Sequence, residues 1–201
     1  MAVSLHLPLI WEIAKYEHPG NVETAFYELL DHCLEMIRNF HKRKYDILRN
    51  TSCSTNPMCF TQGGLYKGFK KPTDKIGDLV DYMTASFGIT GLHDLTVVAK
   101  GKSLLEDKGE FAKEVVRHIQ QRVNEFKKED GYLYALYGTP AESLCMTQAK
   151  QLKKFYEDTN QLEKAYKVPE YLMNSFHRIK VANSSNTIGK LCELRNVGVV
   201  L

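Results

Sequence analysis

The chain lacks the long apolar runs of membrane-spanning proteins and the paired cysteines of proteins with disulfides or structural zinc sites. No stretch approaches the roughly 20 apolar residues needed to cross a bilayer, and residues 1–4 lack the charged and apolar regions of a signal peptide. The five cysteines are scattered and form no C-x-x-C pair, which indicates reduced thiols and neither a disulfide framework nor a structural zinc site. We therefore expect a cytoplasmic protein with no membrane contact.

A strong excess of charge is missing too. The 27 Lys and Arg residues nearly balance the 24 Asp and Glu residues, and the net charge of +3 is interleaved along the chain. This is too mild for a nucleic-acid-binding surface. With 43% hydrophobic and 25% charged residues over 201 positions, the composition is that of one sizeable globular domain.

Hydrophobic periodicity predicts strands that alternate with helices. Strand patterns occur at 3–7, 84–89, 132–137 and 171–181, helical patterns occur at 22–48, 76–83, 91–99, 111–126 and 140–157, and a polar, glycine-containing loop covers 50–75. Such alternation predicts an α/β fold made of βα units, with a mostly parallel sheet that is open or curved into part of a barrel and long amphipathic helices outside it.

The junction after the strand at 132–137 has the chemistry of an anion site. Gly138 permits a sharp turn, Thr139 is the expected N-cap, Pro140 suits the first helical position, and Glu142 completes a capping box. Free backbone N–H groups and the positive end of the helix dipole would converge there, so a phosphate or carboxylate can bind. The residues alone leave an alternative open, which is an ordinary well-capped helix.

The histidines do not form a metal-binding pattern. There are seven of them, yet none belongs to a His-Glu-x-x-His pair, and His32, His41 and His118 lie on amphipathic helices. We expect them to lie at the surface or to make structural hydrogen bonds. The sequence therefore predicts no metal site.

Four blocks of sequence resemble the anaerobic, glycyl-radical (class III) ribonucleoside-triphosphate reductases. Residues 3–8 resemble the family's strand that ends in Asn-Leu-Pro-Arg-Ile, and residues 86–94 resemble its Gly-x-x-Gly-Leu-x-Glu block. Residues 137–144 are similar to Thr-Pro-Ala/Ser-Glu-Ser-Leu, and residues 171–177 to Tyr-Tyr-Thr-Asn-Ser-Phe-His. The blocks keep the family's order from residue 3 to about residue 181.

The resemblance implies a fold and a radical reaction. Residues 1–181 would form part of a ten-stranded α/β barrel, and residues 182–201 would be a divergent, irregular tail. In that family a thiyl radical on a finger-loop cysteine removes a ribose 3′ hydrogen. The thiyl radical is generated from a glycyl radical that a separate radical-SAM activating enzyme makes.

The resemblance also implies substrate-binding residues. Thr139 and the backbone N–H groups of Ala141, Glu142 and Ser143 would hold the substrate phosphates. A further set would line the same cavity near the ribose, namely His6, Asn174 and Ser175. His6 stands where the family usually has Asn, and Leu9 where it has Arg.

The finger-loop cysteine and the glycyl-radical loop have no counterpart in this sequence. We therefore expect the chain to be part of an anaerobic reductase that is inactive in isolation and binds no cofactor itself. It would bind a ribonucleoside triphosphate and associate with the remaining reductase segments and the activating enzyme. The alternative is a non-catalytic nucleotide-binding or assembly subunit that supplies part of a barrel. Unpaired strand edges in either case predict an oligomer.

Overall fold

The computed structural model describes residues 2–62, 69–139 and 142–168. Their elements are β1 (Ala2–His6), α1 (Leu7–Glu17), α2 (Val22–Asn50), η1 (Cys53–Thr55), η2 (Met58–Gln62), η4 (Gly77–Tyr82), β2 (Ala85–Thr90), α3 (Leu92–Lys100), α4 (Glu110–Asp130), β3 (Tyr134–Gly138) and α5 (Glu142–Asp158). Residues 162–168 are also helical. The fold therefore combines long helices with short strands.

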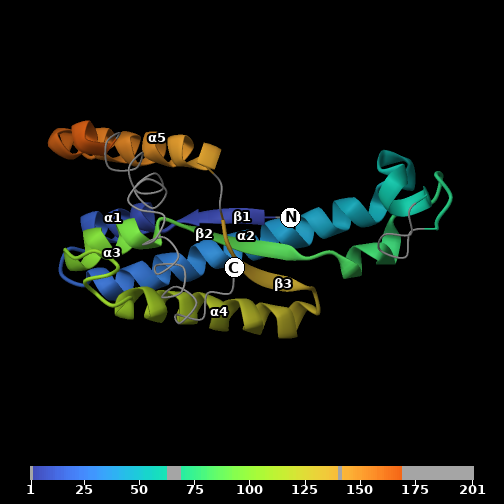
Figure 1. Ribbon diagram of the computed structural model, residues 1–201, viewed down its shortest axis with the longest axis horizontal. Coiled ribbons are helices and arrows are strands. Elements are labelled where there is room, and N and C mark those ends of the chain that lie inside the picture. The colour runs from blue at the N-terminus through green and yellow to red at the C-terminus, as the bar shows by residue number, and fades with distance from the viewer. Residues whose placement is uncertain (1, 63–68, 140–141, 169–201) are drawn as a thin grey trace, which may run out of the picture. The chain divides into compact units, whose positions relative to one another are not determined.

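The three strands form one parallel sheet in the order β1-β2-β3 (Figure 1). The N–H of Ala85 donates to the carbonyl of Leu133 at 2.9 Å, and that of Thr139 donates to the carbonyl of Ile89 at 3.2 Å. Residue numbers increase along both β2 and β3 from the first bond to the second, as in a parallel pair. The predicted α/β character with parallel strands is confirmed at this level, and the strand predicted at 171–181 lies outside the described residues.

Most predicted elements are present with shifted ends. The helix expected at 22–48 is α2, and the carbonyl of Asn21 accepts its first helical bond from Ala25 at 3.2 Å, as an N-cap residue should. Two expectations were wrong. The strand does end before Pro8, but Pro8 lies in the first turn of α1, a helix that the sequence did not predict. The loop at 50–75 is partly ordered by η1, η2 and a bridge between Ser52 and Lys75.

Contacts divide the chain into two compact units. The first unit comprises the described residues 2–3, 31–62, 69–87 and 119–137, and the second comprises 4–30, 88–118, 138–139 and 142–168. The two units are described separately below.

The core of the first unit is aromatic. The Phe87 ring in β2 lies 5.4 Å from the ring of Tyr134 in β3 and 6.0 Å from that of Phe126 in α4. His41 of α2 packs against the same ring at 5.2 Å, and its Nε2 lies 3.2 Å from the carbonyl oxygen of Ser86. Because side chains alternate along β2, Phe87 lies on the face that the helices cover, where a large aromatic side chain can be buried.

An ion pair joins α2 to the end of α4 in the first unit. Arg38 donates from Nε and Nη2 to the two carboxylate oxygens of Asp130, both at 2.7 Å. Lys42 and the hydroxyl of Tyr134 bind the same carboxylate at 3.1 Å. A negative charge at a helix C-terminus opposes the dipole, but the hydrogen bonds from Arg38 hold the pKa of Asp130 down at about 2.

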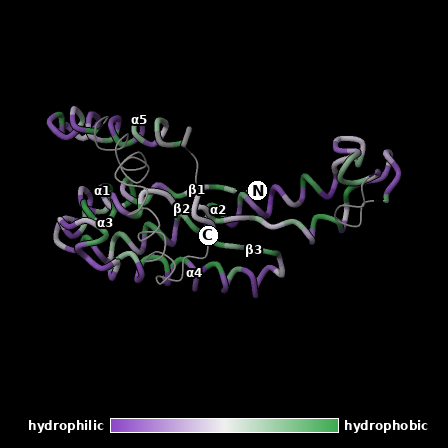
Figure 2. Tube along the Cα trace, in the orientation of Figure 1, coloured by the Kyte–Doolittle hydropathy of each residue, from purple (hydrophilic) through white to green (hydrophobic). Residues whose placement is uncertain are grey.

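The second unit is built on α1 and α3, which lie side by side (Figure 1). The Trp11 ring of α1 lies 5.2 Å from the ring of Phe26 and 5.6 Å from that of Phe111. Gly91 has a left-handed φ of 73°, and a Cβ there would lie 2.8 Å from the ring of Pro8. The helices carry alternating apolar and polar residues (Figure 2), so that one face of each is available for such packing.

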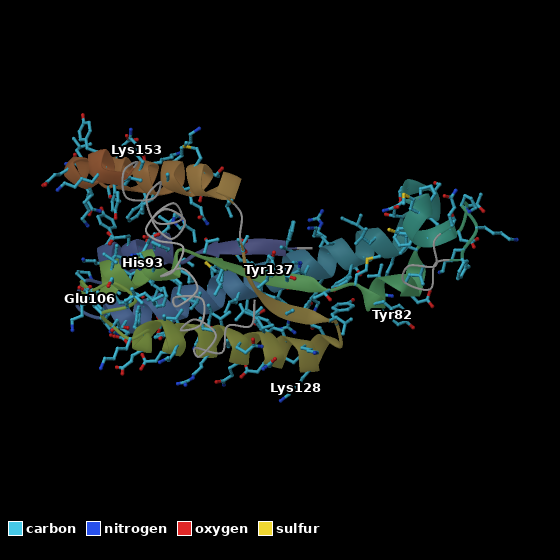
Figure 3. All side chains as sticks on the ribbon, viewed as in Figure 1. Tyr82, His93, Glu106, Lys128, Tyr137 and Lys153 are labelled. Atoms are coloured by element: carbon cyan, nitrogen blue, oxygen red, sulfur yellow. The ribbon has the colours of Figure 1, made fainter. Side chains whose placement is uncertain are left out.

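A smaller apolar cluster holds α5 to residues 162–168 in the second unit. It consists of Ala149, Leu152, Tyr156, Ala165 and Val168, with Leu9 and Phe155 packed against it. Lys164 also reaches the buried carboxylate of Glu12 in α1, at 3.1 Å. Polar positions lie on the opposite sides of the helices, as the side chains of Lys128 on α4 and Lys153 on α5 illustrate (Figure 3).

None of the helices in the described residues is both long and apolar enough to cross a membrane.

We expect Asp130→Asn to lower the free energy of unfolding by about 2 kcal/mol at pH 7. The folded pKa of about 2 lies below the ordinary carboxylate value, so the stabilisation is fully present above about pH 4 and is lost as the pH falls to about 2. Urea denaturation should therefore give the wild type and Asp130→Asn free energies of unfolding that converge as the pH falls to about 2. The exposed Asp46 of α2 provides the control variant Asp46→Asn. An equal deficit at pH 2 and pH 7 would show that the charge is not responsible.

Candidate functional site

The carboxyl ends of the three parallel strands bring together residues from distant parts of the sequence. β1 ends at His6, β2 at Thr90 and β3 at Gly138, and all three residues belong to the second unit. In parallel α/β sheets, ligands bind outside the carboxyl ends of the strands. This edge is therefore the candidate site.

The sheet face that leads to this edge is polar and has small side chains. The hydroxyl oxygens of Ser4 and Thr139 are 2.7 Å apart and hydrogen-bond across β2. They pass over Gly88, where a Cβ would overlap both hydroxyl groups and lie 3.1 Å from the Cα of Ser4. Since side chains alternate along a strand, His6 shares this face with Ser4, and Thr90 shares it with Gly88. Parallel sheets normally bury apolar residues on both faces, so the hydroxyl groups and the imidazole of this face are unusual and make it the candidate site.

A second hydrogen-bond chain ties α5 to the same face. The amide nitrogen of Gln148 donates to Thr90 Oγ1 at 2.5 Å, and that hydroxyl donates to the carbonyl of Leu5 at 2.7 Å. Gln148 is 6% exposed, so its side-chain amide hydrogen-bonds within the protein and not with solvent. The chain connects α5 with both β1 and β2.

His6 carries unused hydrogen-bonding capacity. Its side chain is 8% exposed, and neither ring nitrogen has a hydrogen-bond partner in the described part of the chain. Burial lowers the pKa of His6 to about 4, so the imidazole is neutral near pH 7 and offers one donor and one acceptor. An unsatisfied buried polar group costs about 1–3 kcal/mol, which a ligand that binds it would recover.

The structure places some of the predicted site residues. His6 and Thr139 lie on the same sheet face, and the Thr139 hydroxyl binds Ser4, a partner that the sequence did not suggest. α5 begins at Glu142, so Glu142 and Ser143 contribute the backbone of its first turn. Four positions lie outside the described residues: Pro140, Ala141, Asn174 and Ser175. The predicted capping box and the cavity role of the last two therefore stay predictions.

Ser4, Gly88, Thr90 and Gln148 belong to the site but were not predicted. The strands did carry a signal for three of them, because Ser4 alternates with Leu5 and Gly88 and Thr90 alternate with Ile89. A polar or small residue at every second position of a parallel strand departs from the usual apolar pattern and indicates a face that makes polar contacts. Nothing local to α5 marks Gln148.

Two further histidines, His93 and His118, have structural contacts. His93 Nδ1 of α3 accepts the N–H of Leu104 at 3.5 Å, next to a reciprocal pair in which Ser103 and Glu106 bind each other's backbone N–H groups (Figure 3). His118 packs its ring on Tyr27 at 4.8 Å. Within residues 2–62, 69–139 and 142–168, no group of three or more His, Cys, Asp or Glu side chains is placed to hold a metal ion.

Fold and site together define an α/β protein with a small parallel sheet and a polar sheet face at the carboxyl ends of its strands. The family model for anaerobic ribonucleoside-triphosphate reductase matches residues 2–192. The chain therefore belongs to the anaerobic ribonucleoside-triphosphate reductase family.

Individual relatives carry the same description. The anaerobic ribonucleoside-triphosphate reductase of Salmonella typhimurium is 30% identical over 149 residues, which are 71% of this chain and 20% of that protein. The Haemophilus influenzae protein is 28% identical over 94% of this chain and 26% of its own length. The phage T4 protein is 24% identical over 71% of this chain. The chain thus spans about a fifth to a quarter of the relatives it matches.

Gly88→Ala should destabilise the chain by about 2 kcal/mol, because the new Cβ displaces the Ser4 and Thr139 hydroxyls and presses on the β1 backbone. Thermal unfolding would measure this loss. Gly20→Ala is the matched control, because a Cβ there meets nothing within 4 Å. Combining Gly88→Ala with Ser4→Ala should recover part of the loss. Equal stability of Gly88→Ala and Gly20→Ala would contradict the close strand contact.

The free energy of unfolding should fall as the pH is lowered from about 6.5 to about 4. Burial lowers the pKa of both His6 and His41 to about 4, so protons bind the unfolded chain first and stability is lost across this interval. Each histidine contributes about 3 kcal/mol to the loss. We expect His6→Asn to remove about half of this loss in urea titrations at stepped pH, with a substitution of the exposed His18, His18→Asn, as the matched control. An unaltered acid slope in His6→Asn would refute the burial of a neutral ring.

Proposed function

We propose that this chain forms the nucleotide-holding part of an anaerobic ribonucleoside-triphosphate reductase, which converts ribonucleoside triphosphates into deoxyribonucleoside triphosphates. The observation that carries the proposal is the polar sheet face at the carboxyl ends of β1, β2 and β3, from which α5 begins. Membership of the reductase family supports it. A triphosphate requires an anion site, and the ribose hydroxyl groups require hydrogen-bond donors and acceptors nearby.

The phosphates would bind at the start of α5. The first N–H groups of a helix have no intrahelical partner and lie at the positive end of its dipole. Donors of this kind would come from Ala141, Glu142 and Ser143. Thr139 contributes by fixing the end of β3, because its N–H binds Ile89 at 3.2 Å and its hydroxyl binds Ser4 at 2.7 Å.

The ribose would face the neutral ring of His6. An uncharged imidazole gives one hydrogen bond to a sugar hydroxyl oxygen and accepts one from a hydroxyl proton. Both of its nitrogens are unengaged by the described residues, so binding would satisfy them without breaking an existing contact. We assign Asn174 and Ser175 to the same cavity on the strength of the family resemblance.

Other parts of the enzyme would supply the radical chemistry. A glycyl radical, made by a radical-SAM activating enzyme, provides the means of hydrogen abstraction from the ribose when the enzyme is assembled. The free cysteines Cys33, Cys53 and Cys59 all belong to the first unit, whereas Ser4, His6, Gly88, Thr90 and Thr139 of the polar sheet face belong to the second. We therefore assign the residues of this chain to binding and orientation of the nucleotide.

Assembly with further reductase segments fits the sheet. Among the described strands, β1 and β3 lie at the edges of the sheet, and edge strands offer unpaired backbone groups to other strands. We propose that additional strands complete the ten-stranded barrel of the family. The protein would then act as an oligomer or as one segment of a larger enzyme, in the cytoplasm and without a nucleic-acid partner.

Ser143→Pro tests the phosphate site directly, because proline removes one backbone donor and is still tolerated in a first helical turn. We expect it to weaken binding of a ribonucleoside triphosphate about tenfold in calorimetric titrations, since a hydrogen bond to a charged group contributes about 1.5–3 kcal/mol. Ser143→Ala, which keeps the N–H, is the matched control and should bind like the wild type.

The unphosphorylated ribonucleoside completes this test. It should bind the wild type far more weakly than the triphosphate, and Ser143→Pro should not change its affinity. Equal affinities of the wild type for nucleoside and triphosphate would refute the phosphate site. Triphosphate binding by a chain that adds nothing to the activity of a reconstituted reductase would favour a non-catalytic nucleotide-binding subunit.

A further inference from the structure

Two side-chain hydrogen bonds hold the end of β3 and the beginning of α5 to the sheet. At the end of β3, Thr139 binds Ser4 of β1 at 2.7 Å. In the second turn of α5, Gln148 binds Thr90 of β2 at 2.5 Å. Both hydrogen bonds end on the polar face of the sheet and both lie within the second unit.

The Gln148 hydrogen bond has features of a specific contact. Gln148 lies in the second turn of α5 and is 6% exposed, and its partner Thr90 is anchored in turn to the carbonyl of Leu5 at 2.7 Å. Burial of an amide is unfavourable unless it is hydrogen-bonded. An apolar residue at this position would pack equally well, so the amide adds direction to the contact and little to the hydrophobic burial.

Directional hydrogen bonds restrain the rotation and sliding of a helix, which apolar contacts alone leave free. Ala149, Leu152 and Tyr156 hold α5 in place through non-directional burial, which tolerates small rotation and sliding of the helix. A short bond from Gln148 to Thr90 fixes the rotation of α5 about its axis. The amides of its first turn then point in a fixed direction, and displacement of a binding group by about 1 Å can cost about 100-fold in activity.

We propose that Thr90, acting through Gln148, and Ser4, acting through Thr139, are positioning residues that aim the first-turn amides of α5 at the substrate phosphates. The inference rests on the proposed function of that turn. It assigns the nucleotide affinity of the site partly to residues that do not touch the nucleotide.

The test compares Thr90→Val, which removes the hydroxyl and keeps the shape, with Thr90→Ser, which keeps the hydroxyl. The probes are a ribonucleoside triphosphate and inorganic tripolyphosphate, titrated into the full chain by calorimetry. We expect Thr90→Val to weaken both probes about tenfold, as for the loss of one or two hydrogen bonds, and Thr90→Ser to stay within about twofold of the wild type.

Thr96→Val is the matched control for a general loss of stability. Thr96 is a fully buried threonine of α3 whose hydroxyl donates to the carbonyl of Leu92 at 2.9 Å. Thr96→Val removes the same hydroxyl group as Thr90→Val, in the same unit but in α3 and not at the contact with α5. We expect Thr96→Val to lower the melting temperature as Thr90→Val does while binding both probes like the wild type.

Amide hydrogen exchange gives a readout that does not depend on ligand. Thr90→Val should speed exchange in the first two turns of α5 and leave α3 unchanged, and Thr90→Ser should restore the slow exchange. Wild-type affinity and exchange in Thr90→Val would overturn the positioning role and leave the phosphate site standing, as would an equal loss of affinity in Thr96→Val. A wild-type chain that binds neither probe would overturn the proposed function and this inference with it.

Discussion

The hydroxyl–hydroxyl bond between Ser4 and Thr139 over Gly88 is the contact on which the candidate site depends. It brings β1 and the end of β3 close across β2, and it is possible because the residue between them has no side chain. Any larger residue at position 88 would separate the strands at the point where their carboxyl ends meet. The position of Thr139, and with it the start of α5, follows from this close approach.

The two faces of the sheet strands have different roles. Phe87 and Tyr134 are buried among the helices of the first unit, and the bond between Arg38 and Asp130 fixes the end of α4 to α2 there. On the other face, Gly88 and Thr90 leave room for polar contacts. Neighbouring positions of β2 thus contribute to apolar packing and to polar contacts separately, because side chains alternate along a strand.

Family membership and geometry support the same functional proposal from independent directions. The family model covers residues 2–192, whereas the geometry provides a polar sheet face and an imidazole, that of His6, whose two nitrogens have no hydrogen-bond partner among the described residues. In the assembled enzyme this chain would hold the substrate, and other segments would carry the radical. The strand edges at β1 and β3 indicate where such segments would join the sheet.

The long helices α2 and α4 could be predicted because their apolar residues recur with the period of a helix over many turns. The sequence also predicted the parallel βα order and the strand-to-helix junction at Gly138. It did not predict α1, since Pro8 after a short strand reads equally well as a strand end and as a helix start.

Only the tertiary structure paired Ser4 with Thr139, 135 residues away, and Thr90 with Gln148, 58 residues away. Local sequence determined which backbone each segment adopts, because propensity and periodicity act between neighbours. The partners of the polar side chains were decided by the packing of strands and helices that are distant in the chain, and no short-range pattern encodes that packing.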